Sequence, residues 1–262
     1  MKVMAAALAL LFGLATQASA GLSSAALEAV GVEPRPGAAL PLSMQFRDES
    51  GRVRSLGDAL GSGPGVVIFA DYTCHSLCGP ILAFAAAGLA QSGLTAGRDY
   101  RLMVIGLDPK DGLDAARDMK ASRIAAAGPL AEATTFLTGD EAAIHATTAA
   151  LGYRYAYDPE HDQFAHPAAA FVVNAHGRLT RVLSGIGLSG SDLRLALVDA
   201  GEGRVGSFGD RLRLLCYGFD PVRGMYTEAI TFWLEAGAIA TLLCMAGGIF
   251  FMQRKVRGRT TA

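Results

Sequence analysis

The sequence predicts an α/β sandwich with a mixed central sheet, followed by a C-terminal transmembrane helix. Short apolar runs that are typical of buried strands, at 66–70 and 101–109, alternate with Ala- and Leu-rich stretches that are typical of helices. Two further short strands within 169–185 form a hairpin late in the chain, so the predicted sheet is mixed. A chain of 262 residues is long enough for one domain with a sizeable core.

Both ends of the chain predict export and membrane anchoring. Residues 1–20 hold one positive charge, an apolar run and a small-residue cleavage pattern at 18–20, as signal peptides do. Residues 228–252 are apolar apart from Glu235 and a few small polar residues, and are long enough to cross a bilayer core of about 30 Å. The basic tail, 253–262, favours the cytoplasmic side, so the preceding domain is expected outside the cytoplasm. A buried core helix is the alternative for the proposed span.

The first half of the predicted domain begins after a linker. Residues 21–41 are rich in Ala, Gly and Pro, and 42–56 alternate apolar and polar residues around a glycine-bearing turn, which predicts a hairpin. The strand at 66–70 follows Gly-Pro-Gly and is predicted to be buried on both faces. Pro80 then lies near the start of a helix that reaches about Ala90.

The second half repeats this alternation and closes on a helix. The predicted elements are a strand at 101–109, a helix at 113–127, a strand at 134–139, a helix at 140–151, the hairpin within 169–185 and a helix at 189–200. A thioredoxin-like arrangement fits this order best, which places the domain at 42–203 and leaves 204–227 as a juxtamembrane segment.

The charges and the cysteine count exclude some classes of protein. Lys and Arg number 23 against 24 Asp and Glu, and the basic residues are scattered apart from the tail, so no nucleic-acid partner is expected. Of the four cysteines, Cys244 falls inside the predicted span and is expected to pack inertly. Three cysteines remain for an oxidising compartment, and an odd number argues against a simple disulfide framework.

Two of these cysteines, Cys74 and Cys78, lie four positions apart where a predicted strand meets a predicted helix. Residues four apart share one face of a helix, so both sulfurs can point to a common site. A helix N-terminus lowers the pKa of a nearby thiol and supplies thiolate, which is both a nucleophile and a soft metal ligand. The spacing leaves three alternatives open: a metal site, a redox pair or a passive disulfide.

A metal held by two thiolates needs at least one more donor, and imidazole is the expected one in a site that accepts copper. His75 would project to another side of the helix, and His145 and His176 are expected to face solvent. His161 and His166 precede the late hairpin, in a segment expected beside the tip of the cysteine-bearing helix in a thioredoxin-like sheet. His166 abuts the strand and is the better placed. A histidine that is only hydrogen-bonded at the end of a loop is the alternative.

The chain resembles the SCO/SenC proteins, which are copper-binding factors for cytochrome oxidase assembly. The matching pieces are the motif CHSLC at 74–78, the sequence GLDPKD at 106–111, and His166, located 88 residues beyond Cys78. Longer stretches at 136–166 and 212–230 are similar to a bacterial subgroup with a membrane span after the copper domain. The resemblance covers most of residues 60–255.

This resemblance implies a thioredoxin-like fold with copper, as Cu(I), Cu(II) or both, bound by Cys74, Cys78 and His166. It implies a non-enzymatic metallochaperone, with thiol-disulfide oxidoreductase activity left open, that is anchored in a bacterial inner membrane with its domain in the periplasm. The implied partner is the copper-bearing subunit of a respiratory cytochrome oxidase, with other periplasmic copper chaperones or thiol reductases as further partners. The alternative is a thiol-disulfide reductase that keeps the cysteines of the oxidase copper site reduced.

Two positions depart from the family pattern. Gly79 stands where a proline usually follows the second cysteine, and Ala165 stands where an acidic residue often precedes the histidine. These departures are expected to change the copper affinity more than the set of residues that bind the copper. Cys216, in the juxtamembrane segment, is expected either to act as an auxiliary ligand or resolving thiol, or to pack as a small apolar residue.

Overall fold

The computed structural model describes most of the chain between its two ends. The described ranges are 29–74, 78–124, 128–159, 162–184, 188–202, 205–207, 210, 217–220, 225–228, 239 and 241–245, without the side chains of 78–80, 217–220 and 225–228. The predicted signal peptide at 1–20 and the tail at 253–262 lie outside these ranges, as does most of the predicted span at 228–252.

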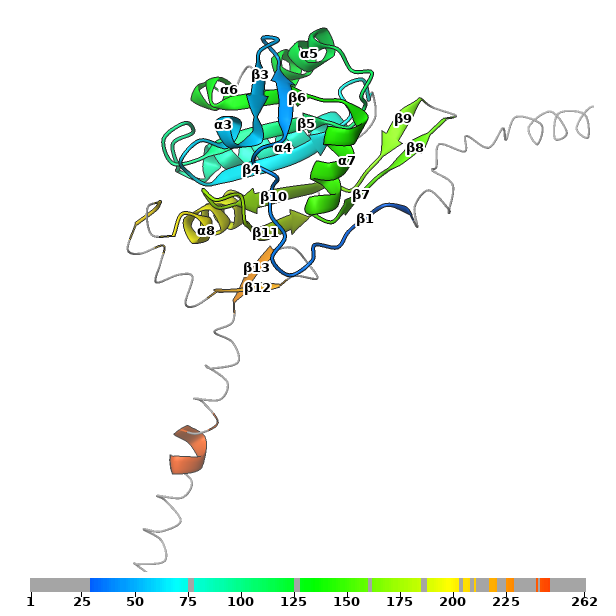
Figure 1. Ribbon diagram of the computed structural model, residues 1–262. Helices are drawn as coiled ribbons and strands as arrows, with labels where there is room; N and C mark the ends of the chain where they lie inside the picture. Colours follow the sequence, from blue (N-terminus) through cyan, green and yellow to red (C-terminus); the bar gives the residue numbers. More distant parts are fainter. Residues whose placement is uncertain are drawn as a thin grey trace, which may run out of the picture.

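A mixed sheet of seven strands forms the centre of the domain (Figure 1). In spatial order the strands are β11 (Leu179–Ser184), β10 (Ala169–Val173), β4 (Gly65–Ala70), β5 (Arg101–Gly106), β6 (Thr134–Thr138), β2 (Gln45–Asp48) and β3 (Val53–Ser55). The three central strands β4, β5 and β6 are parallel, and every other neighbouring pair is antiparallel. The predicted mixed α/β sheet and both predicted hairpins are therefore confirmed.

Helices cover both faces of this sheet, because its central strands are apolar on both sides. All six residues of β4 are buried. Val66 and Ile68 belong to one core cluster, while Val67 and Phe69 belong to the other. The first cluster is completed by α4 (Cys78–Gln91), α5 (Leu113–Arg123), α6 (Pro129–Glu132) and α8 (Gly190–Ala200). The second is completed by α3 (Leu56–Leu60) and α7 (Glu141–Ala150). This sandwich is consistent with the predicted thioredoxin-like arrangement.

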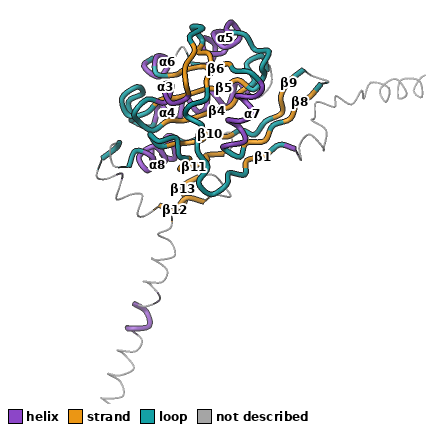
Figure 2. Tube along the Cα trace, in the orientation of Figure 1, coloured by secondary structure: helices purple, strands orange, loops and turns teal. Residues whose placement is uncertain are grey.

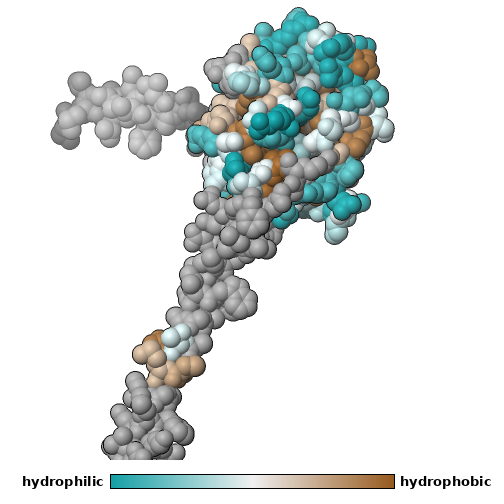
Figure 3. All heavy atoms as spheres, turned by 90° about the vertical axis from the view of Figure 1, so that its left-hand side faces the viewer, coloured by the Kyte–Doolittle hydropathy of each residue, from teal (hydrophilic) through white to brown (hydrophobic). Residues whose placement is uncertain are grey.

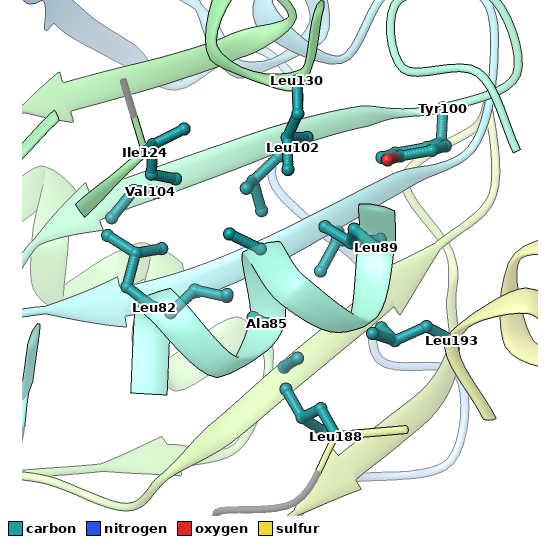
Figure 4. Packing of buried hydrophobic residues seen from close by; sticks show 14 of the residues in the cluster. Leu82, Ala85, Leu89, Tyr100, Leu102, Val104, Ile124, Leu130, Leu188 and Leu193 are labelled. Atoms are coloured by element: carbon teal, nitrogen blue, oxygen red, sulfur yellow. The ribbon is translucent and has the colours of Figure 1, made fainter. Parts of the chain in front are cut away.

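Helix α4 carries the second cysteine of the motif and is held firmly against the sheet. Leu82, Ala85 and Leu89 are buried on its inner side (Figure 4) and face Leu102 and Val104 of β5. Gly88 allows a close approach on another side of the helix, because a Cβ there would lie 2.5 Å from the carbonyl oxygen of Leu188. The apolar contacts fix the position of the helix relative to the end of β4.

Several short elements did not follow from the sequence. They are α3, α6, the pair β1 (Gly31–Val32) and β7 (Tyr153–Arg154), and the pair β8 (Ala156–Asp158) and β9 (Gln163–Ala165). Figure 2 shows β8 and β9 extending beyond the main sheet. Elements of two to five residues are too short for a period to stand out, and the two pairs depend on contacts between strands. The predicted helix at 113–127 ends earlier, at Arg123, with Ile124 as its C-cap, and 125–127 are not described.

The chain remains attached to the domain after α8. Arg194 of α8 forms two hydrogen bonds of 2.7 Å with the carboxylate of Asp210, which is 5% exposed. The predicted juxtamembrane segment also contains a hairpin, in which β12 (Tyr217–Asp220) pairs with β13 (Met225–Glu228). The segment therefore contains regular structure that its sequence did not predict.

Within the predicted span, residues 239 and 241–245 are helical. Figure 3 shows apolar side chains at this place, and Ile239, Leu242, Leu243 and Met245 are 58–68% exposed. Cys244 is also exposed. Of the helices that the structure describes, none combines the length and apolarity that crossing a membrane requires.

Candidate functional site

The first part of the candidate site is the loop that leaves β4. Cys74 lies four residues beyond this strand and is 8% exposed. Its backbone N–H donates to the carbonyl oxygen of Asp71 at 3.3 Å, so the loop turns back on itself. Helix α4 then begins at Cys78, whose side chain is not among those described. The motif lies at the predicted junction of a buried strand and a helix, but Cys74 precedes the helix. The expectation that both cysteines share one helix face is therefore wrong.

Tyr72 anchors this loop in the core. Its hydroxyl lies 2.9 Å from the carbonyl oxygens of Val104 and Leu137, to which it donates, and it accepts from the backbone N–H of Leu137 at 3.1 Å. Burial raises the pKa of Tyr72 well above its ordinary value. A Cβ at Gly106 would lie 3.0 Å from the Tyr72 ring, so the glycine leaves room for it. The start of the cysteine loop, two residues before Cys74, is therefore held in place by the packing and hydrogen bonds of Tyr72.

The sequence GLDPKD forms the loop beside the cysteine loop. The Asp111 carboxylate accepts a hydrogen bond of 3.0 Å from the backbone N–H of Tyr72. Burial raises the pKa of Asp111 to about 6, and the charges of Asp71 and Asp108 act in the same direction. Three buried carboxylates, those of Asp71, Asp108 and Asp111, therefore lie close enough to influence one another, and those of Asp71 and Asp111 bond to the cysteine loop.

The pairing of β4 with β10 brings the histidine segment to the same edge of the sheet. These strands are antiparallel, with Ile68 opposite Ala170 and Gly65 opposite Val173. The carboxyl end of β4 therefore lies beside the amino end of β10. Cys74 follows the first strand and His166 precedes the second, so the two segments emerge next to each other.

Two contacts join these segments directly. The Cys74 Sγ donates to Gln163 Oε1 over 3.7 Å, a contact between residues 89 positions apart. The backbone N–H of Phe164 donates to Asp71 Oδ2 at 2.9 Å, across 93 positions. Gln163 and Phe164 both belong to β9, which ends immediately before His166. The predicted closeness of the cysteine loop and the histidine segment is therefore present in the structure.

The ring of His166 is oriented by Tyr153, which is 3% exposed. Nδ1 of His166 lies 2.9 Å from the Tyr153 hydroxyl and 3.2 Å from the carbonyl oxygen of Pro167. The Tyr153 hydroxyl donates its proton to the same carbonyl at 3.0 Å. Both oxygens near Nδ1 therefore act as acceptors, which assigns the ring proton to Nδ1 and the lone pair to Nε2.

Burial lowers the pKa of His166, while the Pro167 carbonyl and the charge of Asp71 act in the opposite direction. The lowering dominates, so the imidazole is neutral at pH 7. A neutral ring with its proton on Nδ1 presents Nε2 as a nitrogen donor of the kind that metals bind.

The other predicted residues are placed as follows. His145 on α7 and His176 in the turn between β10 and β11 are exposed, as expected. His75, His161 and Cys216 lie outside the described residues. Within the described ranges, no group of three Cys, His, Asp or Glu side chains is arranged to hold a metal ion, and Cys78 is not among the side chains described.

Four residues of the site were not singled out in the sequence: Asp71, Asp111, Tyr153 and Gln163. Asp71 directly follows a wholly apolar strand, and Asp111 closes the GLDPKD sequence, so both had a local signal. Tyr153 and Gln163 had none, because their contacts depend on how distant segments pack.

Solved structures with a similar fold come from several organisms. A protein from Aquifex aeolicus shares 18% identity, with a TM-score of 0.55 over 66% of this chain and 96% of that one. BsSco, a member of the Sco family of cytochrome c oxidase assembly proteins, shares 17% identity, with a TM-score of 0.52 over 64% of this chain and 97% of that one. At these identities the likeness concerns the fold.

A third similar structure is Bradyrhizobium japonicum ScoI, which was solved with copper bound. It shares 17% identity and has a TM-score of 0.48 over 64% of this chain and 99% of that one. No curated protein sequence matches the chain. The sequence model of the SCO1/SenC family matches residues 34–191, which is more than half of the 262 residues. The chain therefore belongs to the SCO1/SenC family.

Proposed function

We propose that this protein binds copper through Cys74, Cys78 and His166 and delivers it to a cytochrome oxidase during assembly. Membership of the SCO1/SenC family supports this function. The observation that carries it is the junction of the two segments, in which Gln163 contacts the sulfur of Cys74 and Phe164 contacts Asp71. A cysteine loop and a histidine segment that are distant in the sequence are thereby held at one edge of the sheet.

The chemistry of these donors suits copper. Thiolate sulfur and neutral imidazole nitrogen are ligands that copper accepts, and Cu(I) prefers the softer sulfur. The lowered pKa of His166 keeps its ring neutral, so no proton has to leave the imidazole at pH 7. The cysteines must be reduced before copper binds, which couples copper loading to their redox state.

Delivery would take place at a membrane. Support comes from the apolar sequence at 228–252 with its basic tail, and from the exposed apolar side chains of Ile239, Leu242, Leu243 and Met245. An anchor of this kind would keep the copper domain on the periplasmic side, near the copper-bearing oxidase subunit. Copper would then pass between shared ligands one bond at a time, without release to solvent.

The copper site is tested by metal binding to the reduced full-length protein in detergent. We expect the wild type to bind one copper ion, and Cys74→Ser, Cys78→Ser and His166→Ala to weaken binding severely. His145→Ala is the matched control, because His145 is exposed on α7 and should leave binding unchanged. Wild-type affinity and spectra in His166→Ala would remove His166 from the ligand set.

A second function, thiol-disulfide exchange, is favoured by the position of Cys78 at the start of α4. The helix N-terminus lowers the pKa of a nearby thiol and so activates it. The burial of Cys74 acts against this function, because exchange with a protein disulfide requires an accessible sulfur. An exchange enzyme would keep its turnover in His166→Ala and lose it in Cys74→Ser, whereas a copper carrier shows no such turnover.

A further inference from the structure

We propose that Asp71 is a positioning residue that joins the two halves of the copper site and places a negative charge beside them. The inference rests on the proposed copper site at Cys74 and His166. It adds to that site a residue that is not itself a copper ligand. Asp71 occupies the last position before the cysteine loop, immediately after β4.

The carboxylate of Asp71 divides its two oxygens between the two segments. Oδ1 accepts hydrogen bonds from the backbone N–H and the hydroxyl of Thr73, at 3.1 Å and 3.0 Å. Oδ2 accepts from the backbone N–H of Phe164 at 2.9 Å. Thr73 precedes Cys74 directly, and Phe164 lies two residues before His166. One side chain therefore bonds to both the sulfur-bearing and the imidazole-bearing segment.

Burial makes these bonds strong. Asp71 is 1% exposed, so water does not compete for its oxygens. A hydrogen bond to a charged acceptor is stronger than one between neutral groups, and a buried carboxylate that loses a donor is costly. A displacement of either segment would break bonds to the same carboxylate, which keeps the two segments in register before any metal arrives.

The charge of Asp71 also lies close to the histidine segment, because its Oδ2 accepts from the backbone N–H of Phe164, two residues before His166. The residue directly before His166 is Ala165, which carries no charge. Asp71 supplies a carboxylate to the same neighbourhood from the other segment. A fixed negative charge attracts Cu(II) more than Cu(I), because the Coulomb energy grows with the charge of the ion.

The test compares two substitutions of Asp71 in the full-length protein with its cysteines reduced. The measured quantities are the Cu(I) and Cu(II) affinities and the reduction potential of the bound copper. Asp71→Asn keeps the size and loses the charge, so we expect about 10- to 100-fold weaker binding, as for other residues that orient ligands. The loss should be greater for Cu(II), and the reduction potential should rise. Asp71→Glu keeps the charge but misplaces its oxygens, so both affinities should fall by a similar factor.

Asp48→Asn is the matched control. Asp48 is also a buried carboxylate, 2% exposed, with hydrogen bonds from Ser50 and Arg52. It lies on β2, three strands from β4 in the sheet, and its loss should affect thermal unfolding without changing either copper affinity.

The outcomes separate this inference from the function on which it rests. Wild-type affinities in Asp71→Asn, combined with loss of binding in Cys74→Ser, overturn the role of Asp71 and leave the copper site intact. An equal loss for Cu(I) and Cu(II) in Asp71→Asn overturns the electrostatic part. Failure of the wild type to bind copper overturns the proposed function itself. If Asp71→Asn does not fold, the copper affinities of Asp71→Glu and Asp48→Asn are compared instead. A loss in Asp71→Glu alone supports the role of the carboxylate position, and wild-type affinity in Asp71→Glu overturns it.

Discussion

Single buried polar residues determine the geometry of the site. Tyr153 fixes the proton of His166 on Nδ1, and Asp71 bonds to both segments. Each of these side chains is at most 3% exposed, and each is hydrogen-bonded to groups from other parts of the chain. Buried polar groups of this kind are costly unless their bonds are complete, so they specify one arrangement of the backbone around them.

Tyr153→Phe tests the orientation of the histidine. The change removes the hydroxyl beside Nδ1 and keeps the ring, which stacks on Phe69 with centroids 4.6 Å apart. We expect copper affinity to fall by about 10-fold and the Cu(II) spectrum to change, because the imidazole loses a partner that fixes its orientation. Competition assays and electron paramagnetic resonance measure these effects.

Tyr155→Phe is the control for this change, since the Tyr155 hydroxyl bonds to Thr148 and not to His166. An equal effect of the two substitutions on copper binding would contradict a specific role for the Tyr153 hydroxyl.

At the scale of elements, the strength of the local pattern decided what the sequence could predict. The wholly apolar run of β4 and the capped start of α7, where Asp140 accepts from the backbone N–H of Ala143 at 2.8 Å, were both expected and are present. The pair β8 and β9 was not expected, although β9 carries the contacts to the cysteine loop. Strands of three residues have no clear period, and their pairing depends on the packing of Tyr155, Phe164 and Tyr157.

Helix α4 is predicted to depend on its inner face for stability. Leu82 is fully buried against the sheet, whereas Phe84 is 45% exposed on the same helix. Leu82→Ala should lower the free energy of unfolding by about 2–5 kcal/mol, because it removes apolar contacts and leaves a cavity. Phe84→Ala should change it by about 0.5 kcal/mol or less. Denaturant unfolding followed by circular dichroism measures both values, and a similar cost for the two variants would contradict this assignment of faces.

At the scale of the whole molecule, carboxylates with opposite pKa shifts control how stability depends on pH. Hydrogen bonds with Ser50 and the charge of Arg52 outweigh burial and lower the pKa of Asp48 to about 2, so this group stabilises the fold above its ordinary pKa of 3.8 and loses that effect as the pH falls toward 2. Burial raises the pKa of Asp111 to about 6, so its contribution is present below pH 3.8 and is lost as the pH rises through 6.

Asp111→Asn should therefore flatten the pH dependence between about 4 and 6. The amide oxygen can still accept from Tyr72, while the cost of ionising a buried carboxyl disappears. Relative to the wild type, the variant should gain about 1–3 kcal/mol of stability between pH 4 and pH 7. Denaturant unfolding at a series of pH values gives this difference in the free energy of unfolding. The contribution of His166 is the same in both proteins and cancels in the difference. A difference that does not change with pH would contradict the raised pKa.

The sequence by itself determined the mixed α/β class, the order of the main elements and the place of the cysteine motif. These features depend on local apolar periods, on turn and cap residues, and on a motif whose residues are adjacent. Only the tertiary structure decided how the distant segments meet. The antiparallel pairing of β4 with β10 brings Cys74 and His166 to one edge, and Asp71 and Tyr153 then hold them through contacts across the fold. Such contacts have no local signal, because they depend on strand order and on burial of the whole sheet.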